Sequence, residues 1–391
     1  MVKNSRAFKD MQQCKAEQVL KIHPYAVTRL SGSDGRWSTH VTGSTKRKTV
    51  RASTYEGLMD KLYDFYFLQD GVSVLTMDKL FHEWLSYKEC ITDSPGTIRR
   101  HEQHWNRYFS SWKLKSAVSY DRLELQKQCN LLVKDNHLSS KEWQNVKTIL
   151  SGMFSYAAEK HYLDEDIMPG IKITVKFRQV NKKTGKTETF QTDELEALLR
   201  YLDDEFKRTL DAALLAVRFN FFAGCRVGEL VALKWCDLAD LYHLHIRREE
   251  IRQSVRCGDK WEDFYTVVEH TKTHTDRIIP LVPGAVRLLN DIRFKAHSEP
   301  SGDDFIFMRD GVRITSRQIN YVLEKACRHL GISVKRSHKI RKTFASLLAA
   351  KNVPLDSIRE LLGHSNLNTT LGYIYNPLTE KETYALMKKA L

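Results

Sequence analysis

Apolar and polar residues alternate between short turns near the start of the chain. Residues 21–53 contain the runs KIHPYAVTRL, RWSTHVTG and STKRKTVRAS, with the turn SGSDG after the first run. This pattern predicts two or three short strands. A helix is predicted next, over residues 53–68, with Ser53 or Thr54 as its N-cap. Its apolar face comprises Leu58, Leu62 and Phe65. We expect a small α+β unit at residues 1–70.

Residues 72–168 carry apolar positions at three- and four-residue spacing. The pattern occurs in four runs: TMDKLFHEWLSYKE, SPGTIRRHEQHWNRYFSSW, DRLELQKQCNLLVKD and SKEWQNVKTILSGMFSYAAEKHYL. Such spacing predicts amphipathic helices, and we expect an all-α domain at residues 71–170. Residues 171–187, IKITVKFRQVNKKTGKT, then carry six Lys or Arg and no acid. A basic stretch without a core pattern predicts a linker.

The remaining residues, 188–391, mix helical and strand-like patterns. A helix is predicted from Thr192 with that residue as its N-cap, and a nearly all-apolar helical run, KRTLDAALLAVRFNFFAG, ends at Gly224. LYHLHIRR, DFYTVVEH and RIIPL predict a small sheet. Five further helical runs lie between residue 283 and the end of the chain. The expected fold class is therefore multidomain and mainly α with small β-sheets, with an α+β domain at residues 188–391.

The net charge of the chain is the first indication of its binding partner. The formal net charge of +14 indicates a polyanionic partner, with nucleic acid ahead of a membrane surface. No apolar run has the length of a membrane span, and the polar start MVKNSRAFKDMQQCK lacks the apolar stretch of a signal peptide, so we expect a cytoplasmic protein. Seven scattered cysteines without a CxxC pair predict buried free thiols.

Three groups of basic residues are candidates for phosphate binding. One lies at the tip of the predicted amino-terminal sheet, one on a predicted helix and one in the linker. A solvated basic surface accounts for the same residues, and the sequence leaves both interpretations open. The candidates are Lys46, Arg47, Lys48, Arg99, Arg100, Arg107, Lys182 and Lys183.

Candidate catalytic residues occur only in the second half. Arg226 follows the glycine that ends the apolar helix, where its fork could bind a tetrahedral anion; a cap or an ion pair with Glu229 is the alternative. His338 and Arg341 are three residues apart and share one helix face. An acid–base group beside a guanidinium suits phosphodiester chemistry, although such pairs also arise by chance.

Three more candidates complete the set. Lys272 is predicted at the tip of a hairpin, from which it could protonate a leaving oxygen or simply be solvated. His364 ends one short helix, and Tyr373 is predicted in the next. Two further pairs of histidines, at 243 and 245 and at 270 and 274, have no carboxylate or cysteine at a familiar metal-ligand spacing, so no metal site is predicted.

The order Arg, Lys, His-x-x-Arg, Gly-His and Tyr resembles that of the tyrosine recombinases. It is carried by AGCRVGELVALKW, HTKTHTDRIIPL, SHKIRKTFASLLA and LLGHSNLNTTLGYIY. The upstream part resembles the arm-type DNA-binding domain (1–70) and the core-binding domain (71–170) of phage and conjugative-element integrases, ahead of a catalytic domain. Lys342 is a departure, because the family more often has histidine after the second arginine.

The resemblance implies a mechanism without cofactors. Tyr373 would attack the scissile phosphate to form a 3′-phosphotyrosine, while Arg226 and Arg341 hold the phosphate oxygens. Lys272 would be the general acid, with His338 assisting proton transfer and His364 hydrogen-bonding the phosphate. Tyr375 would be a neighbour on the same helix that points elsewhere.

The implied partner is double-stranded DNA at attachment or element-end sites, on which four copies of the chain assemble as a homo-tetramer. No membrane partner is implied. An excision factor and a host DNA-bending protein are further implied partners, and the expected location is the bacterial nucleoid. The element would be a conjugative transposon or a prophage, with a modest preference for the former. The alternative functions are a catalytically silent DNA-binding regulator and a type IB-like topoisomerase.

Overall fold

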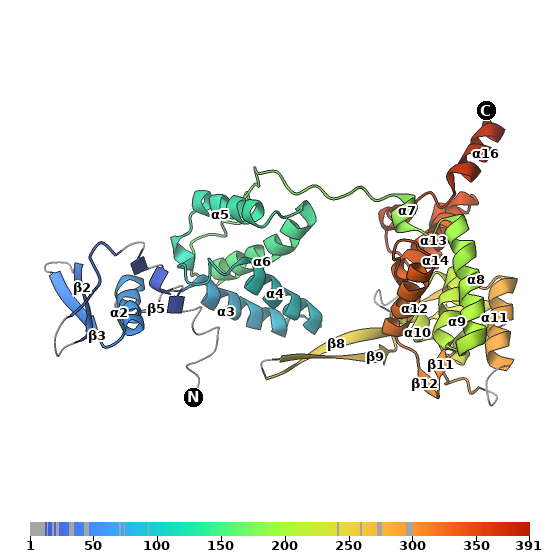
Figure 1. Ribbon diagram of the computed structural model, residues 1–391, viewed down its shortest axis with the longest axis horizontal. Coiled ribbons are helices and arrows are strands. Elements are labelled where there is room, and N and C mark those ends of the chain that lie inside the picture. The colour runs from blue at the N-terminus through green and yellow to red at the C-terminus, as the bar shows by residue number, and fades with distance from the viewer. Residues whose placement is uncertain are drawn as a thin grey trace. The chain divides into compact units, whose positions relative to one another are not determined.

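The protein divides into two compact units, Met1–Val180 and Asn181–Leu391 (Figure 1). The computed structural model describes residues 12–13, 15–17, 19–20, 23–30, 35–42, 47–69, 72–73, 75–92, 94–240, 242–258, 260–271, 276–294 and 300–391. The division falls inside the basic segment 171–187. The carboxyl end of that segment is not wholly irregular, because α7 (Gly185–Glu188) forms there and belongs to the second unit.

The first unit opens with the predicted small sheet and helix. The elements are β1 (Thr28–Arg29), β2 (Trp37–Thr42), β3 (Arg47–Ala52), α2 (Tyr55–Phe67) and the short pair β4 (Leu68–Gln69) and β5 (Val72–Ser73). The sheet is antiparallel in the order β1-β2-β3. Thr54 caps α2, since its Oγ1 accepts the Gly57 amide at 3.0 Å. Leu58 and Leu62 are buried as predicted, but Phe65 is exposed, so the apolar face of α2 is narrower than expected.

The four predicted helices of the first unit are confirmed. They are α3 (Met77–Cys90), α4 (Pro95–Tyr108), α5 (Arg122–Asp135) and α6 (Ser140–Glu159). Aromatic stacking forms much of their core: the Phe81 and Trp105 rings lie parallel with centroids 4.4 Å apart. The Trp105 indole also donates to Asp78 at 2.8 Å, so its polar edge is satisfied inside the core.

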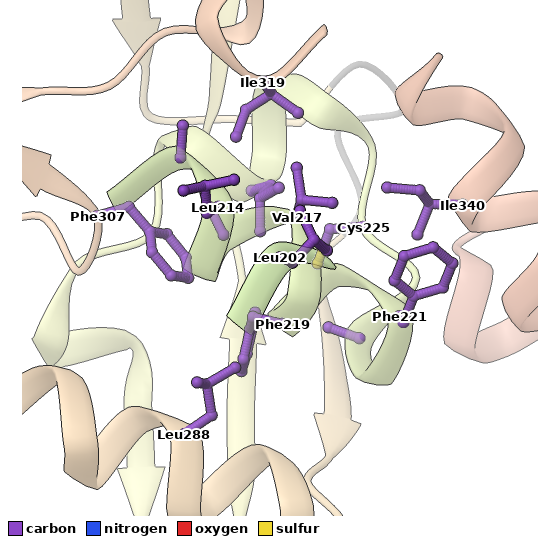
Figure 2. Close-up of a cluster of buried hydrophobic side chains, with 14 of the residues drawn as sticks. Leu202, Leu214, Val217, Phe219, Phe221, Cys225, Leu288, Phe307, Ile319 and Ile340 are labelled. Atoms are coloured by element: carbon purple, nitrogen blue, oxygen red, sulfur yellow. The ribbon is translucent and has the colours of Figure 1, made fainter. Parts of the chain in front are cut away.

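The second unit is a helical domain built around α9 (Ala212–Ala223). Its other helices are α8 (Thr192–Thr209), α10 (Val227–Val231), α11 (Pro283–Phe294), α12 (Ser316–His329), α13 (Ser337–Ala350), α14 (Leu355–Leu362), α15 (Leu367–Leu371) and α16 (Glu380–Ala390). Side chains of α9, among them Leu214, Val217 and Phe219, lie in the buried cluster (Figure 2). A helix that is apolar on nearly every side is expected to be buried, and most of the side chains of α9 are.

Two helix starts differ from the prediction. The run predicted as one helix through residues 207–224 is interrupted at Leu210, which adopts a left-handed conformation that ends α8. Asp211 then caps α9 by accepting the Ala213 amide at 3.0 Å. The N-cap of α8 is Gln191 rather than Thr192, in a capping box with Glu194. At α9 the cap is the Asp211 side chain, whereas at α8 the Glu194 carboxylate accepts the Gln191 amide at 2.9 Å.

Small antiparallel sheets complete the second unit. Their strands are β6 (Leu238–Asp240), β7 (His243–Ile246), β8 (Glu249–Cys257), β9 (Lys260–Val268), β10 (Arg277–Pro280), β11 (Met308–Arg309) and β12 (Val312–Arg313). The order β10-β7-β6 confirms part of the predicted sheet. β9, however, pairs with β8, which was not predicted, and their hairpin extends from the helices of its own unit (Figure 1).

The chemistry of the cysteines is only partly as expected. All six described cysteines are free, but Cys90, Cys236 and Cys257 are exposed, so only three are buried thiols. None of the helices in the described ranges is both long and apolar enough to cross a membrane.

Candidate active site

Arg226 stands at a turn fixed by buried hydrogen bonds. α9 ends at Gly224, which adopts a φ of 60°, and Asn220 then bonds both the amide and the carbonyl of Cys225, at 2.7 and 3.1 Å. Arg226 is the next residue, at the N-cap of α10. Its Nη1 donates to Glu229 at 2.8 Å and its Nη2 to the Gly363 carbonyl at 3.4 Å. The ion pair considered as an alternative therefore exists, and it fixes a partly exposed guanidinium in place.

Arg341 is held more tightly still. It lies on α13, is 1% exposed, and donates through Nη1 to the Gly224 carbonyl at 2.8 Å and through Nη2 to the Leu362 carbonyl. Its buried Nε has no hydrogen-bond partner among the described residues. Burial lowers the pKa of the guanidinium to about 10, and the carboxylate of Glu229 opposes that shift. The side chain is therefore still a cation at neutral pH.

Glu229 and Arg277 form the buried base of the site, and sequence reasoning missed Arg277. Glu229 is fully buried, and Arg277 from β10 pairs with it. Burial alone would raise the pKa of Glu229, but the hydrogen bonds and charge of Arg277 lower it to about 2. The only sequence signal for Arg277 was its place at the end of HTKTHTDR.

The two histidines lie against Tyr373. The ring centroid of Tyr373 is 5.0 Å from that of His338 and 4.6 Å from that of His364, both edge to face. His364 is buried, and its Nδ1 lies 3.0 Å from the Thr370 hydroxyl. The pKa of each histidine is lowered to about 4, mainly because burial disfavours the charged ring and also because cations lie nearby. Both rings are therefore neutral at pH 7.

Tyr373 itself is not in a helix. α15 ends at Leu371, and the Tyr373 amide donates to the Thr370 carbonyl at 2.9 Å in the turn that follows. Tyr375 also lies beyond the helix, so the argument that two residues on one helix point apart does not apply. The prediction was wrong because α15 is only five residues long and stops at its C-cap, Gly372. The Arg341 guanidinium lies 5.9 Å from the centre of the Tyr373 ring.

The structure thus brings together five of the six predicted catalytic residues: Arg226, His338, Arg341, His364 and Tyr373. Lys272 lies outside the described residues. Its predicted hairpin is wrong, because the strands before and after it, β9 and β10, pair with β8 and β7 and not with each other.

The candidate phosphate contacts occupy several elements. Arg47 and Lys48 are on β3, whereas Lys46 lies outside the described residues. Arg99, Arg100 and Arg107 are on α4, and the Arg107 guanidinium lies 5.1 Å from the Tyr108 ring centre. Lys182 and Lys183 are exposed just before α7. In the part of the chain that the structure describes, no group of three or more His, Cys, Asp or Glu could hold a metal ion.

Comparison with known proteins gives concordant matches. Residues 188–382 match the model of the phage integrase family. A XerC-like tyrosine recombinase of Caldanaerobacter subterraneus subsp. tengcongensis is 26% identical over 339 residues, covering 82% of this chain and 85% of the relative. The tyrosine recombinase XerD of Listeria monocytogenes is 26% identical over 301 residues, covering 74% of this chain and 92% of that protein.

Solved structures share the fold. The Tn1549 transposon integrase in complex with a circular intermediate DNA superposes with a TM-score of 0.60 at 17% identity, covering 81% of this chain and 99% of that one. A lambda integrase dimer bound to a COC′ core site gives 0.56 at 13% identity, covering 88% of this chain and 93% of the other. The chain therefore belongs to the phage integrase family, as one of its tyrosine recombinases.

Proposed function

We propose that the second unit cleaves and rejoins DNA through a covalent bond between Tyr373 and a 3′-phosphate. The observation that carries this proposal is the surroundings of one phenol. Two neutral imidazoles and a buried guanidinium lie within 6 Å of the Tyr373 ring, measured between centroids or from the guanidinium carbon. A neutral imidazole can accept the proton of a hydroxyl, and a guanidinium can stabilise the negative charge of a phosphorane-like transition state.

In the proposed cleavage step, every bond and proton is accounted for by the DNA and by side chains of the protein, without a metal ion or a nucleotide. The Tyr373 oxygen bonds to phosphorus, the bond from phosphorus to the 5′-oxygen breaks, and Lys272 gives that oxygen a proton. His338, neutral at pH 7, takes the phenol proton. Arg226 and Arg341 neutralise the charge on the non-bridging oxygens, and His364 hydrogen-bonds the phosphate. A 5′-hydroxyl of a partner strand reverses these events to rejoin the DNA.

The first unit would hold the DNA. We assign residues 1–70 to arm-type sites and residues 71–170 to the core site, joined through the linker 171–187 to the catalytic domain 188–391. At arm-type sites, Lys46 and the β3 residues Arg47 and Lys48 would contact phosphates. At the core site, the phosphate contacts would be Arg99, Arg100 and Arg107. Lys182 and Lys183 would contact phosphates from the linker. The Tn1549 integrase is solved with a circular intermediate DNA and the lambda integrase with a core site, which supports the assignment of DNA contacts to the core-binding and catalytic parts of the chain.

Integration and excision of a mobile element is the reaction that this assignment supports, and the fold shared with the Tn1549 transposon integrase fits it. A conjugative transposon is the preferred element, and a prophage is the other. Exchange between two duplexes requires four protomers, so we assign a homo-tetramer on DNA at the bacterial nucleoid. An excision factor and a host DNA-bending protein would set the direction. The apolar side chains of α16, including Leu386 and Met387, are about half exposed and are available for a neighbouring subunit.

Covalent trapping tests the proposal. The protein is mixed with a nicked suicide duplex carrying the end of its element and run on a denaturing gel beside Tyr373→Phe and Tyr375→Phe. We expect a DNA-linked band from wild type and from Tyr375→Phe, and none from Tyr373→Phe. A band lost only in Tyr375→Phe would move the nucleophile by two residues. No band from any variant, on DNA that the protein binds, would make it a DNA-binding regulator.

A further inference from the structure

One stripe of α13 holds the segment that carries the nucleophile. His338, Lys342 and Ser346 are spaced four residues apart and so lie on one face of the helix. The Ser346 hydroxyl donates to the Tyr373 carbonyl at 3.3 Å and accepts the Tyr375 amide at 3.0 Å. Because this segment lies beyond the end of α15, contacts with α13 replace the helical hydrogen bonds that would otherwise fix it.

Lys342 contacts the rings themselves. Its Nζ lies 5.7 Å from the centre of the Tyr373 ring and 5.0 Å from that of Tyr375. A lysine ammonium within about 6 Å of an aromatic ring is attracted by its electron-rich face. The Lys342 side chain is 7% exposed, so water screens this attraction only weakly.

Glu188 keeps the ammonium in place. It lies on α7, at the end of the basic segment, and forms ion pairs with Lys342 and, at 2.5 Å, with Lys339. Burial would raise the pKa of this carboxyl, but the two lysines lower it to about 2, so it is ionised. A buried lysine that is paired with an ionised carboxylate has little freedom to leave the two rings.

We infer that Lys342, anchored by Glu188, is a positioning residue for DNA cleavage: it fixes the orientation of the Tyr373 ring and hence the direction of the attacking oxygen. The inference rests on the proposed role of Tyr373 as nucleophile. It gives a function to the position at which this chain departs from the common histidine. It also ties the nucleophile to α7, and through α7 to the segment that joins the two units.

Lys342→Met tests the inference, with Lys339→Met as the matched control. Both variants remove one of the two lysines that pair with Glu188, but only Lys342 contacts Tyr373. The rate of covalent complex formation is measured in a single turnover at saturating suicide duplex. We expect Lys342→Met to slow it about tenfold or more, and Lys339→Met by less than about threefold. Lys342→Arg, which keeps a cation over the rings, should recover most of the rate.

A second substrate distinguishes an effect of Lys342 on the attacking oxygen from an effect on the leaving oxygen. Replacing the bridging 5′-oxygen by sulfur gives a leaving group that needs no general acid. The defect of Lys342→Met should persist on this substrate, whereas a defect of Lys272→Ala should shrink. Restoration of Lys342→Met by sulfur would overturn the inference, because the lysine would then act on the leaving group.

Each of the remaining outcomes tests either the inference about Lys342 or the proposed function. A wild-type rate for Lys342→Met, or an equal defect in Lys339→Met, would overturn the inference while leaving the proposed function intact. If Lys342→Met fails to fold in a thermal melt, Glu188→Gln takes its place: slowing supports the anchor, and a wild-type rate contradicts it. A covalent band from Tyr373→Phe would instead overturn the proposed function.

Discussion

Glu229 accepts hydrogen bonds from both terminal nitrogens of Arg277, at 3.0 and 2.6 Å, inside the second unit. Arg277 also donates from Nε to the Leu361 carbonyl at 2.8 Å, near the end of α14. Since Glu229 also binds Arg226, one buried carboxylate joins this arginine to the turn that carries His364. The site is therefore built on an ion pair that makes no contact with Tyr373 in the hydrogen bonds or ring contacts described.

Glu229→Gln should be strongly destabilising. The variant keeps the shape of the side chain but leaves Arg277 buried without a counter-charge, which costs about 3 to 5 kcal/mol of the free energy of unfolding. Urea denaturation measures this loss. Glu196→Gln, at an exposed position of α8, is the control and should change the free energy of unfolding by less than about 0.5 kcal/mol. Equal stability of the two variants would contradict a structural role for the Glu229–Arg277 pair.

Gly224→Ala should disturb the turn before Arg226. Gly224 has a φ of 60°, and a Cβ there would lie 2.4 Å from Cδ1 of the buried Phe344 ring. Gly331 has a φ of 66° and nothing within 4 Å of the same position, so Gly331→Ala isolates the backbone strain. We expect about 1 kcal/mol of destabilisation from Gly331→Ala and about 1 to 3 kcal/mol more from Gly224→Ala, measured by thermal denaturation. Cleavage should fall only in Gly224→Ala, and a wild-type rate in that variant would argue against a need for this close packing.

Local signals explain why most of the fold could be predicted. The apolar run of α9 and the glycine at its end locate Arg226, and the spacing of His338 and Arg341 requires only one helix. The pairing of β8 with β9 was not predictable in this way, because strand pairing depends on partners rather than on local pattern. The end of α15 was missed for a similar reason: its five residues are too few to show a helical period.

The supporting residues were beyond local reasoning altogether. Arg277 is 48 residues from Glu229, and Glu188 is 154 residues from Lys342. Nothing in the sequence around either carboxylate specifies a partner at that distance. Charged residues at such positions look like ordinary surface until the fold buries them, and burial is what makes their partners obligatory.

Stability should fall when the protein is acidified, partly through His364. Burial, and then the nearby cations Arg341 and Arg226, lower the pKa of this group from 6.5 to about 4. Between these pH values the unfolded chain binds a proton that the folded chain does not, so this histidine leaves the free energy of unfolding unchanged above about pH 6.5 and lowers it as the pH falls below that value. The contribution of this one histidine is on the order of 2 kcal/mol.

Urea denaturation at several values between pH 4.5 and 7 measures this dependence on the DNA-free protein. Above pH 4.5, Glu229 and Glu188 stay ionised in the folded state because their pKa values are about 2. His364→Gln should therefore give a shallower dependence of the free energy of unfolding on pH than wild type. Parallel curves for the two proteins would show that His364 does not bind its proton differently on folding.

Replacing Leu386 and Met387 on α16 by serine should separate folding from assembly. The two side chains are 53% and 54% exposed, so their loss should change the free energy of unfolding by less than about 0.5 kcal/mol. Binding to one half-site should be unchanged, whereas complexes of four protomers on two duplexes should be lost, as measured by sedimentation or native gels. Lys388→Ser, also exposed on α16, is the matched control and should assemble normally. If the double variant forms the full complex, α16 does not contribute to the contact between subunits; if it unfolds, the helix packs within its own subunit.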